Sequence, residues 1–224
     1  MIKIYGLGNA LIDIEFSISE QDLTGVDIPK GGMKHISSKE KEFLLDKFQD
    51  YEISRTAGGS IANSLSAAAL HGAKASFSGS VGKDKEGIEF LKSLKGLENF
   101  TKYSRKPTGV CIILITPDGE RTMASCLDAN LDLTPECLVD NKLKQSNILI
   151  FDSFTIETNN GFNTVKKSVH IANNNGVEIY FGIANKSLIE LNLEKIAWLL
   201  SQNINYVYGN ELEIKELAKF LPVK

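Results

Sequence analysis

The sequence has 224 residues, of which 42% are hydrophobic and 24% charged, a composition that excludes a disordered or collagen-like chain. A chain of this length predicts one large domain with a smaller appendage rather than a tandem array. The net charge of −3 lacks the excess of lysine and arginine that binds nucleic acid or anionic membranes. We therefore expect a small neutral or anionic ligand.

The cysteines and the N-terminus indicate a cytoplasmic protein. Cys111, Cys126 and Cys137 form no Cys-x-x-Cys pair, and with three histidines the sequence offers no conventional structural zinc site. The N-terminal apolar run is broken by Gly, Asn and Asp, unlike that of a signal peptide. No stretch approaches the ~20 apolar residues that a membrane span requires.

The first part of the chain predicts a strand, a loose region and a helix. Residues 2–7 form an apolar run that glycines end just before Asn9. From 14 to 36, acids and turn residues predict short strands and turns without a helix. A serine-capped helix follows over 39–48. Its predicted apolar side consists of Phe43, Leu44 and Phe48.

The segment from Ala57 to Leu70 is the most informative. Gly58 and Gly59 lead directly into small helix-forming residues, so a turn opens into a helix that packs closely on a sheet. Such a helix start presents free N–H groups and a favourable dipole to a polar ligand, with Asn63 on its first turns. The alternative is an ordinary tight junction between strand and helix.

The remaining elements predict an α/β fold. A strand over 75–81 and a helix over 85–97 precede a hairpin between 110 and 124, and a helix is expected to begin at Pro135. From residue 130 onward, strands and helices alternate. This alternation predicts parallel strands joined by crossover helices.

Two stretches without predicted helices, 14–36 and 103–127, are expected to leave the main sheet and pair as a small β lid. The large α/β domain then comprises residues 1–13, 37–102 and 128–224.

Several polar residues are candidates for ligand binding. Asn9 and Asp13 offer an amide and a carboxylate to the vicinal hydroxyls of a sugar. The alternative is a turn-closing Asn9 and a solvated Asp13. Arg121, in the hairpin, is a candidate contact to a phosphate or base, with a solvated arginine as the simpler interpretation. The three histidines share no motif spacing and receive no role.

Asn210 and Glu213 open the last predicted helix. An acid there can act through water on a magnesium-bound phosphate, and a plain helix N-terminal acid is the alternative.

Two glycine motifs are incomplete. Gly6-Leu-Gly8 begins like a dinucleotide fingerprint, but Leu11 replaces the third glycine, which argues against a Rossmann oxidoreductase. Gly79-Ser-Val-Gly-Lys-Asp84 resembles a phosphate loop with the wrong glycine spacing, and a strand-ending turn is the better interpretation.

In order and spacing, these segments resemble the ribokinase-like (PfkB) sugar and nucleoside kinases, most closely the adenosine kinase-like branch. The segments are Gly6-Leu-Gly-Asn-Ala-Leu-Ile-Asp13, Lys30-Gly-Gly-Met33, Ala57-Gly-Gly-Ser-Ile-Ala-Asn63, Gly79-Ser-Val-Gly-Lys-Asp84, Thr108-Gly109, Asp118-Gly-Glu-Arg-Thr-Met123 and Asn210-Glu-Leu-Glu213. The resemblance implies a doubly wound, mostly parallel sheet flanked by helices, with a β lid.

The same resemblance implies roles for individual residues. Asp13 would grip the sugar hydroxyls, with Asn9, the Gly58-Gly59 turn and Asn63 completing the pocket. Asn210 and Glu213 match an Asn-x-x-Glu element that organises magnesium and phosphate. The implied reaction transfers the γ-phosphoryl group of ATP to a primary hydroxyl, largely through positioning and charge stabilisation.

The sequence also departs from the family pattern. The Gly-Ala-Gly-Asp element, which supplies an anion hole and the catalytic base, does not occur in these 224 residues. Asp128 stands in place of Gly, Asp152-Ser153-Phe154 in place of a Glu-Gly-Tyr-like segment, and Asn185 in place of Asp.

We therefore expect the N-terminal, substrate-binding portion of such a kinase, shortened by a frameshift, premature stop or gene splitting. It would lack the C-terminal part of the fold and any catalytic residue, and would be inactive alone. ATP and Mg²⁺ are the cofactors that the family implies. The alternative is a non-catalytic sugar- or nucleoside-binding pseudo-kinase or subunit, working with a complementing chain or as a homo-oligomer.

Overall fold

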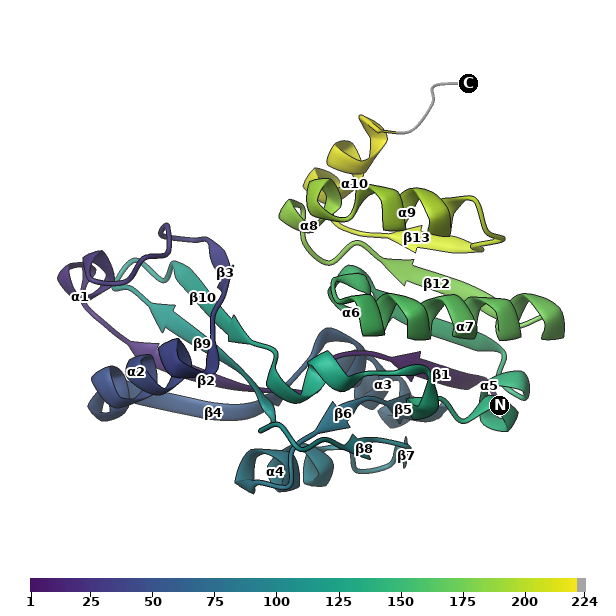
Figure 1. Ribbon diagram of the computed structural model, residues 1–224, viewed down its shortest axis with the longest axis horizontal. Coiled ribbons are helices and arrows are strands. Elements are labelled where there is room, and N and C mark those ends of the chain that lie inside the picture. Colours follow the sequence, from purple (N-terminus) through teal and green to yellow (C-terminus); the bar gives the residue numbers. More distant parts are fainter. Residues whose placement is uncertain (221–224) are drawn as a thin grey trace.

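The computed structural model describes residues 1–220 and contains two main sheets (Figure 1). The six-stranded sheet has the order β13-β12-β11-β1-β5-β7, and every neighbouring pair is parallel. Its strands are β1 (Lys3–Leu7), β5 (Lys74–Ser78), β7 (Glu98–Asn99), β11 (Ile148–Asp152), β12 (Glu178–Gly182) and β13 (Tyr206–Tyr208). The predicted α/β class with a parallel sheet is confirmed.

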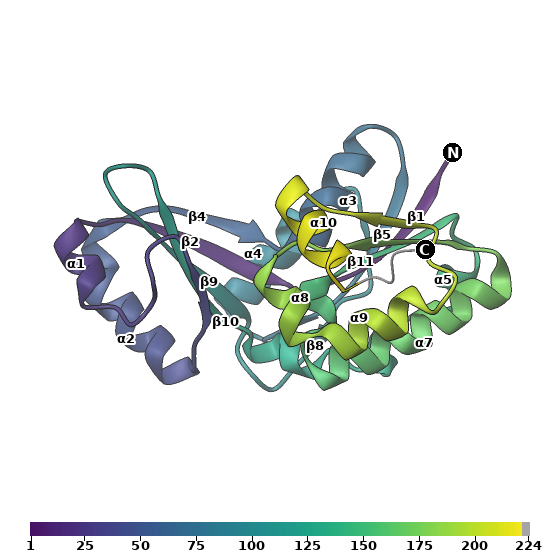
Figure 2. The same ribbon diagram turned by 90° about the horizontal axis from the view of Figure 1, so that it is seen from above.

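The five-stranded sheet has the order β3-β10-β9-β2-β4 and is mixed. Its strands are β2 (Leu11–Ser17), β3 (Met33–His35), β4 (Glu52–Gly58), β9 (Gly109–Ile115) and β10 (Arg121–Cys126). Figures 1 and 2 show this sheet projecting from one end of the six-stranded sheet, and we call it the lid sheet. A short pair joins β6 (Ser80–Val81) to β8 (Lys102–Tyr103).

Helices cover both faces of the six-stranded sheet and one face of the lid sheet. They are α1 (Glu20–Thr24), α2 (Ser38–Phe48), α3 (Ser60–Leu70), α4 (Lys85–Ser93), α5 (Asp140–Lys144), α6 (Ser153–Ile156), α7 (Asn159–Asn175), α8 (Ser187–Leu191), α9 (Leu193–Leu200) and α10 (Glu211–Ala218), with 3₁₀ turns η1 (Gln49–Tyr51), η2 (Asp128–Asp132) and η3 (Pro135–Cys137). Within residues 1–220, no helix combines the length and hydropathy needed to cross a bilayer.

The faces of β1 show how the six-stranded sheet is covered. Ile61 and Leu65 of α3 pack so closely on Gly6 that a Cβ there would overlap both side chains. Tyr5 and Leu7 point to the other face and join a cluster that contains Val165 of α7. Since successive side chains of a strand point to opposite faces, α3 and α7 cover the two faces of the sheet.

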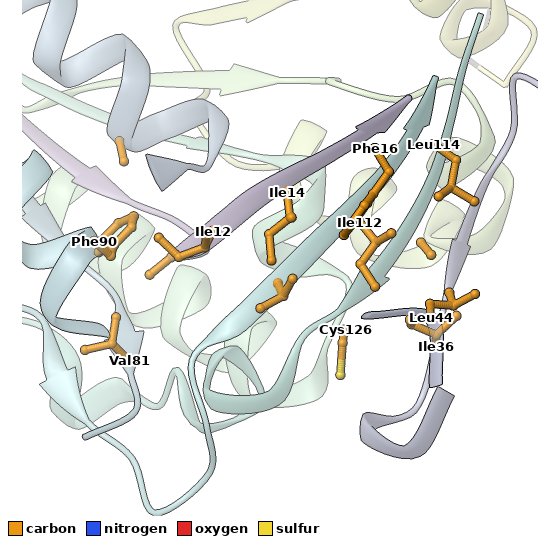
Figure 3. Close-up of a cluster of buried hydrophobic side chains, with 14 of the residues drawn as sticks. Ile12, Ile14, Phe16, Ile36, Leu44, Val81, Phe90, Ile112, Leu114 and Cys126 are labelled. Carbon is orange, nitrogen blue, oxygen red and sulfur yellow. The ribbon is translucent and has the colours of Figure 1, made fainter. Parts of the chain in front are cut away.

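The lid sheet buries one face only. Ile12, Ile14 and Phe16 alternate along β2 with less buried residues, and Figure 3 shows them packed near Ile112 and Leu114 of β9. Helices α2 and α4 contribute further members of this cluster. The other face of the lid sheet is therefore available for a site.

Several local predictions were wrong. The stretch 14–36 contains a helix, α1, because Ser19 forms a capping box with Asp22. On α2, Leu44 and Phe48 are buried but Phe43 is exposed, since it lies off the buried stripe. Pro135 begins only a 3₁₀ turn rather than a helix.

The strands of the lid sheet do not coincide closely with the residue range expected for the lid. β4, for which we had no expectation, belongs to the lid sheet, and β2 enters that sheet at Leu11. The division into a lid of 14–36 and 103–127 stays a prediction. The last four residues of the expected range 128–224 lie outside the described residues.

Candidate functional site

A row of four side chains crosses the uncovered face of the lid sheet. Asp13 of β2 is in register with Cys111 of β9, Cys111 with Ser125 of β10, and Ser125 with His35 of β3. Because Ile12 and Ile14 face the lid core, Asp13 between them faces the opposite side. We call Asp13, Cys111, Ser125 and His35 the lid row.

The lid row lines a cavity of about 200 Å³, which we call the junction cavity. It lies where the lid sheet meets the carboxyl ends of β11 and β12, the usual place for a ligand in an open parallel sheet. The other lining residues are Asn9, Leu11, Met33, Gly59, Ser60, Met123, Leu127, Asp152, Phe154, Ala184 and Asn185.

Gly58 and Gly59 allow two segments that connect the sheets to lie in close contact. Gly59 has φ +98°, and a Cβ on it would overlap the carbonyl oxygen of Asn9. A Cβ on Gly58 would overlap the carboxylate of Asp13. Gly59 is therefore required for its backbone conformation, and both glycines are required because a Cβ would not fit. This bend brings the start of α3 beside the segment that joins β1 to β2.

The Asn130 side chain holds the segment that joins β1 to β2 in place. It is buried, accepts a hydrogen bond from the Ala10 amide (2.7 Å) and donates to the carbonyl oxygens of Ala10 (2.9 Å) and Leu127 (3.0 Å). These bonds anchor the segment between Asn9 and β2. Sequence reasoning did not single out Asn130, because its partner Ala10 is 120 residues away.

The environment of Asp13 disfavours its charge. Burial and, to a lesser extent, the nearby Glu15 raise the pKa of this carboxyl from 3.8 to about 6, against the opposing effect of Arg121. Asp13 is half-buried, and among the described residues no hydrogen bond reaches its carboxylate, although carboxylates withdrawn from water normally have partners. A ligand with hydroxyl groups would supply them.

Asp152 is the second carboxylate on the cavity wall, and it is structural. It caps α6 by accepting from the amide (3.1 Å) and hydroxyl (2.9 Å) of Thr155, and the Ser60 hydroxyl donates to its other oxygen. Burial raises the pKa of Asp152, and these hydrogen bonds oppose that effect. Asp152 thus ties the start of α3 to the end of β11.

The predicted binding residues are only partly brought together. Asn9, Asp13 and Gly59 line the junction cavity, and Gly58 lies against Asp13. Asn63 is exposed on α3 and is not a lining residue. Arg121 lies at the outer end of β10, where it donates to Glu15 (2.9 Å). The binding roles of these residues stay predictions.

Asn210 and Glu213 form a capping box at the start of α10. The Glu213 amide donates to the Asn210 side chain (2.9 Å), and the Glu213 carboxylate accepts from the Asn210 amide (2.9 Å) and side chain (3.0 Å). Both carboxylate oxygens are thus engaged locally. Residues 1–220 contain no group of three or more His, Cys, Asp or Glu side chains that could hold a metal ion.

Sequence reasoning missed His35, to which we gave no role, as well as Cys111, Ser125 and Phe154. The first three lie in the lid row, and the pairing of β2, β9, β10 and β3 brings them to the same face as Asp13. His35 belongs to a strand of three residues, too short to show a period. Phe154 and Asn185 follow strand ends, where loop geometry decides the direction of a side chain.

Comparison with known proteins places this architecture in a family. A model of the pfkB family of carbohydrate kinases matches residues 36–221. Adenosine kinase 2 of Arabidopsis thaliana is 24% identical over 96% of this chain, which spans 64% of that protein's length.

Two solved structures share the fold. The adenosine kinase from Sinorhizobium meliloti has a TM-score of 0.89 at 24% identity, over 97% of this chain and 68% of that one. A probable sugar kinase from Rhizobium etli CFN 42 has a TM-score of 0.86 at 24% identity, over 97% of this chain and 67% of that one. The family match spans most of the chain, and the predicted ribokinase-like fold is confirmed. The chain belongs to the pfkB family of carbohydrate kinases.

Proposed function

We propose that the chain binds a sugar or nucleoside in the junction cavity, as the substrate-binding part of an ATP-dependent phosphotransferase that acts on a hydroxyl group. The observation that carries this proposal is the carboxylate of Asp13. It faces the cavity, its pKa is raised to about 6, and no described residue hydrogen-bonds it. Two hydroxyls of a sugar would donate to this carboxylate and stabilise its charged form.

The remainder of the wall favours a nucleoside over a free sugar. Met33, Met123, Leu127 and Phe154 add apolar surface to the polar groups near Asn9 and Asp13. A ribose with an attached base has this division into a hydroxylated part and a flat, less polar part. Relatives of the chain are named adenosine kinases, and one similar structure is named a probable sugar kinase.

The 224 residues are proposed to bind this substrate without transferring a phosphoryl group. Removing a preorganised set of oxyanion donors costs about 10²–10³-fold in rate in comparable enzymes, and loss of a general base costs a further ~10²–10⁴-fold. The family element implied to supply both is absent from this sequence. ATP and Mg²⁺ remain cofactors implied by the family, and no residue described in this structure is assigned to hold them.

Isothermal titration calorimetry on purified residues 1–224 tests the binding proposal. Adenosine, inosine, ribose and fructose are titrated at pH 7.5 into the wild type, Asp13→Asn and Asp46→Asn. Asp46 is an exposed carboxylate on α2 and provides the matched control. We expect at least one nucleoside or sugar to bind the wild type and the control, with Asp13→Asn weakened at least tenfold. Failure of all four compounds to bind would refute the proposal.

A non-catalytic subunit is the second candidate, and the exposed end of the six-stranded sheet favours it. β13 is an edge strand, and beside it an apolar groove is lined by Leu193, Ala197, Leu200 and Leu217. A partner chain would cover such a surface. A coupled assay tests what the two candidates share, because ATP- and substrate-dependent ADP release by residues 1–224 alone would show an active enzyme and contradict both.

A further inference from the structure

Both ring nitrogens of His35 lie within hydrogen-bonding distance of an oxygen. Nδ1 lies 3.3 Å from the carbonyl oxygen of Ser125, and Nε2 lies 2.5 Å from Oε1 of Glu157. A carbonyl oxygen and an ionised carboxylate both accept, so with Glu157 ionised each ring nitrogen carries a proton and donates. This arrangement describes the imidazolium form of His35 paired with an ionised Glu157.

Glu157 depends on this cation. It lies just after α6, its side chain is only 15% exposed, and its second oxygen, Oε2, is buried without a hydrogen-bond partner among the described residues. A carboxylate held in this way is costly unless a positive charge opposes it. Lys195 of α9 also lies near, but its ammonium donates to the backbone oxygens of Ile156 and Glu157.

The contact joins two parts of the fold that are 122 residues apart in the sequence. His35 belongs to β3, the three-residue edge strand of the lid sheet, which pairs only with β10. Glu157 belongs to the large α/β part. Among the described residues, it is the one hydrogen-bonded contact between β3 and the elements of the six-stranded sheet.

β3 also lines the junction cavity. Met33 and His35 both contribute to its wall, so a shift of β3 changes the shape of the cavity. Separation of His35 from Glu157 would leave this short strand attached through β10 alone. The two ends of the lid row thus differ: Asp13 has no hydrogen-bond partner among the described residues, and His35 is bonded to Glu157 across the cavity.

We propose that Glu157 is a positioning residue, which holds protonated His35 and thereby keeps β3 over the junction cavity, so that ligand binding weakens when His35 loses its proton. The ligand part of this proposal rests on the proposed function. The anchoring of β3 does not, because it is visible without any ligand.

The direction of the pH dependence follows from the two titrating groups in the lid row. The hydrogen bond to Glu157 raises the pKa of His35 above its usual 6.5, although burial opposes this. The contact is therefore intact at low pH and is lost as pH rises through the raised pKa. Asp13 requires its charged form, which appears above pH of about 6. Ligand affinity should be bell-shaped in pH, with Asp13 on the acid limb and His35 on the alkaline limb.

Other charged groups near this contact are already paired or constant in charge over that range. Lys34 pairs with Asp27 on the outer side of β3, and Lys41 pairs with Asp128 behind β10. Asp152, on the opposite cavity wall, has hydrogen-bond partners on both oxygens. The Cys111 thiol stays neutral, since burial raises its pKa to about 11. His35 is thus the group expected to change charge above neutral pH.

The first test measures the titration of His35 by NMR and needs no ligand. The pKa of His35 in the wild type should lie above its usual 6.5 and should fall in Glu157→Gln. Glu190→Gln, which removes an exposed carboxylate on α8, should leave the pKa of His35 unchanged. A pKa of His35 that is the same in the wild type and in Glu157→Gln would overturn the proposal.

The second test follows the lid itself by hydrogen exchange, corrected for intrinsic rates. The amides of Met123 and Ile36, which bond across β3 and β10, should exchange faster above the pKa of His35 and in Glu157→Gln. The glutamine in His35→Gln retains an N–H donor that does not titrate. The same two amides should therefore exchange slowly in this variant, at a rate independent of pH. Protection that stays the same in Glu157→Gln would also overturn the proposal.

The third test repeats the calorimetric titration between pH 5.5 and 9. Affinity in the wild type should fall roughly fivefold on the alkaline limb, the size expected for a partly exposed charged contact, and Glu157→Gln should keep the acid limb of Asp13 but show the weaker affinity above it without an alkaline fall. An alkaline limb that persists in Glu157→Gln would refute the link to binding. Absence of binding at every pH would instead refute the proposed function, and leave the NMR and exchange results to decide the anchoring of β3.

Discussion

The two main sheets of this protein bury their residues differently. The six-stranded sheet is parallel and has helices on both faces, so β11 reads as a nearly continuous apolar run from Ile148 to Phe151. The lid sheet is mixed and buries one face, so β2 alternates between core residues and residues such as Asp13. The polar residues of the lid row therefore lie on the sheet face that no described helix covers, and the parallel sheet supplies stability.

Truncation of the parallel sheet's core should have the largest effect on stability. Phe151 is fully buried and packs on Phe181, with ring centroids 5.5 Å apart. Phe151→Ala is expected to lower the free energy of unfolding by about 3–5 kcal/mol, measured by urea denaturation. Leu70→Ala, at an exposed position on α3, should change it by less than about 0.5 kcal/mol. A loss of ligand affinity in Phe151→Ala without a loss of stability would break the division between the sheets.

A methyl group at the junction should affect both stability and binding. In Gly58→Ala the new Cβ overlaps the Asp13 carboxylate, so that side chain must move. We expect a loss of about 1–3 kcal/mol in the free energy of unfolding, as for other overpacked sites, and at least tenfold weaker ligand binding.

Gly25→Ala is the matched control for this change. Gly25 has φ −85°, and the nearest group to a Cβ there is the flexible end of Lys47. Its stability should stay within about 0.5 kcal/mol of the wild type. Unchanged ligand affinity in Gly58→Ala would show that the position of the Asp13 carboxylate is not critical.

Removal of the Asp13 charge should stabilise the protein while it weakens ligand binding at least tenfold. Because the pKa is raised in the folded state, folding becomes less favourable as pH rises from 3.8 to about 6, and the cost is complete above that range. The shift corresponds to at most ~3 kcal/mol, and partial exposure reduces the expected gain in Asp13→Asn to about 1–2 kcal/mol at pH 8. Below pH of about 4 the gain should vanish. Urea denaturation at both pH values decides, and a less stable Asp13→Asn at pH 8 would contradict this account.

The sequence predicts the strands and helices of the fold better than it predicts which residues come together where the two sheets meet. Strand and helix alternation after residue 130 predicts the parallel sheet, because each helix has its own local period. Asp13 and the Gly58-Gly59 turn were also accessible, since each carries a local signal. The contributions of Cys111, Ser125 and His35 depend on which strands pair and in which register, and pairing across long sequence separations leaves no local pattern.

α1 and β4 were missed for related reasons. α1 has five residues, and a helix that short depends on its capping box more than on any period. β4 is largely exposed at the edge of the lid sheet, so it lacks the buried alternation that would announce a strand. Asn130 and Glu157 act through single long-range contacts, which only a structure can show.

The smallest effect is expected for the helix cap of α10, which belongs to the end of the parallel sheet and not to the junction cavity. Asn210→Ala removes a helix cap and should cost about 1 kcal/mol, similar to Ser37→Ala at the start of α2, which has the same type of capping box. Since α10 contributes no residue to the cavity wall, the affinity for a sugar or nucleoside should be unchanged in both variants. If Asn210→Ala alone weakened that affinity, Asn210 and Glu213 would act on the bound substrate as well as on the helix. The family role predicted for the pair would then extend to this chain, and the site would reach beyond the lid sheet.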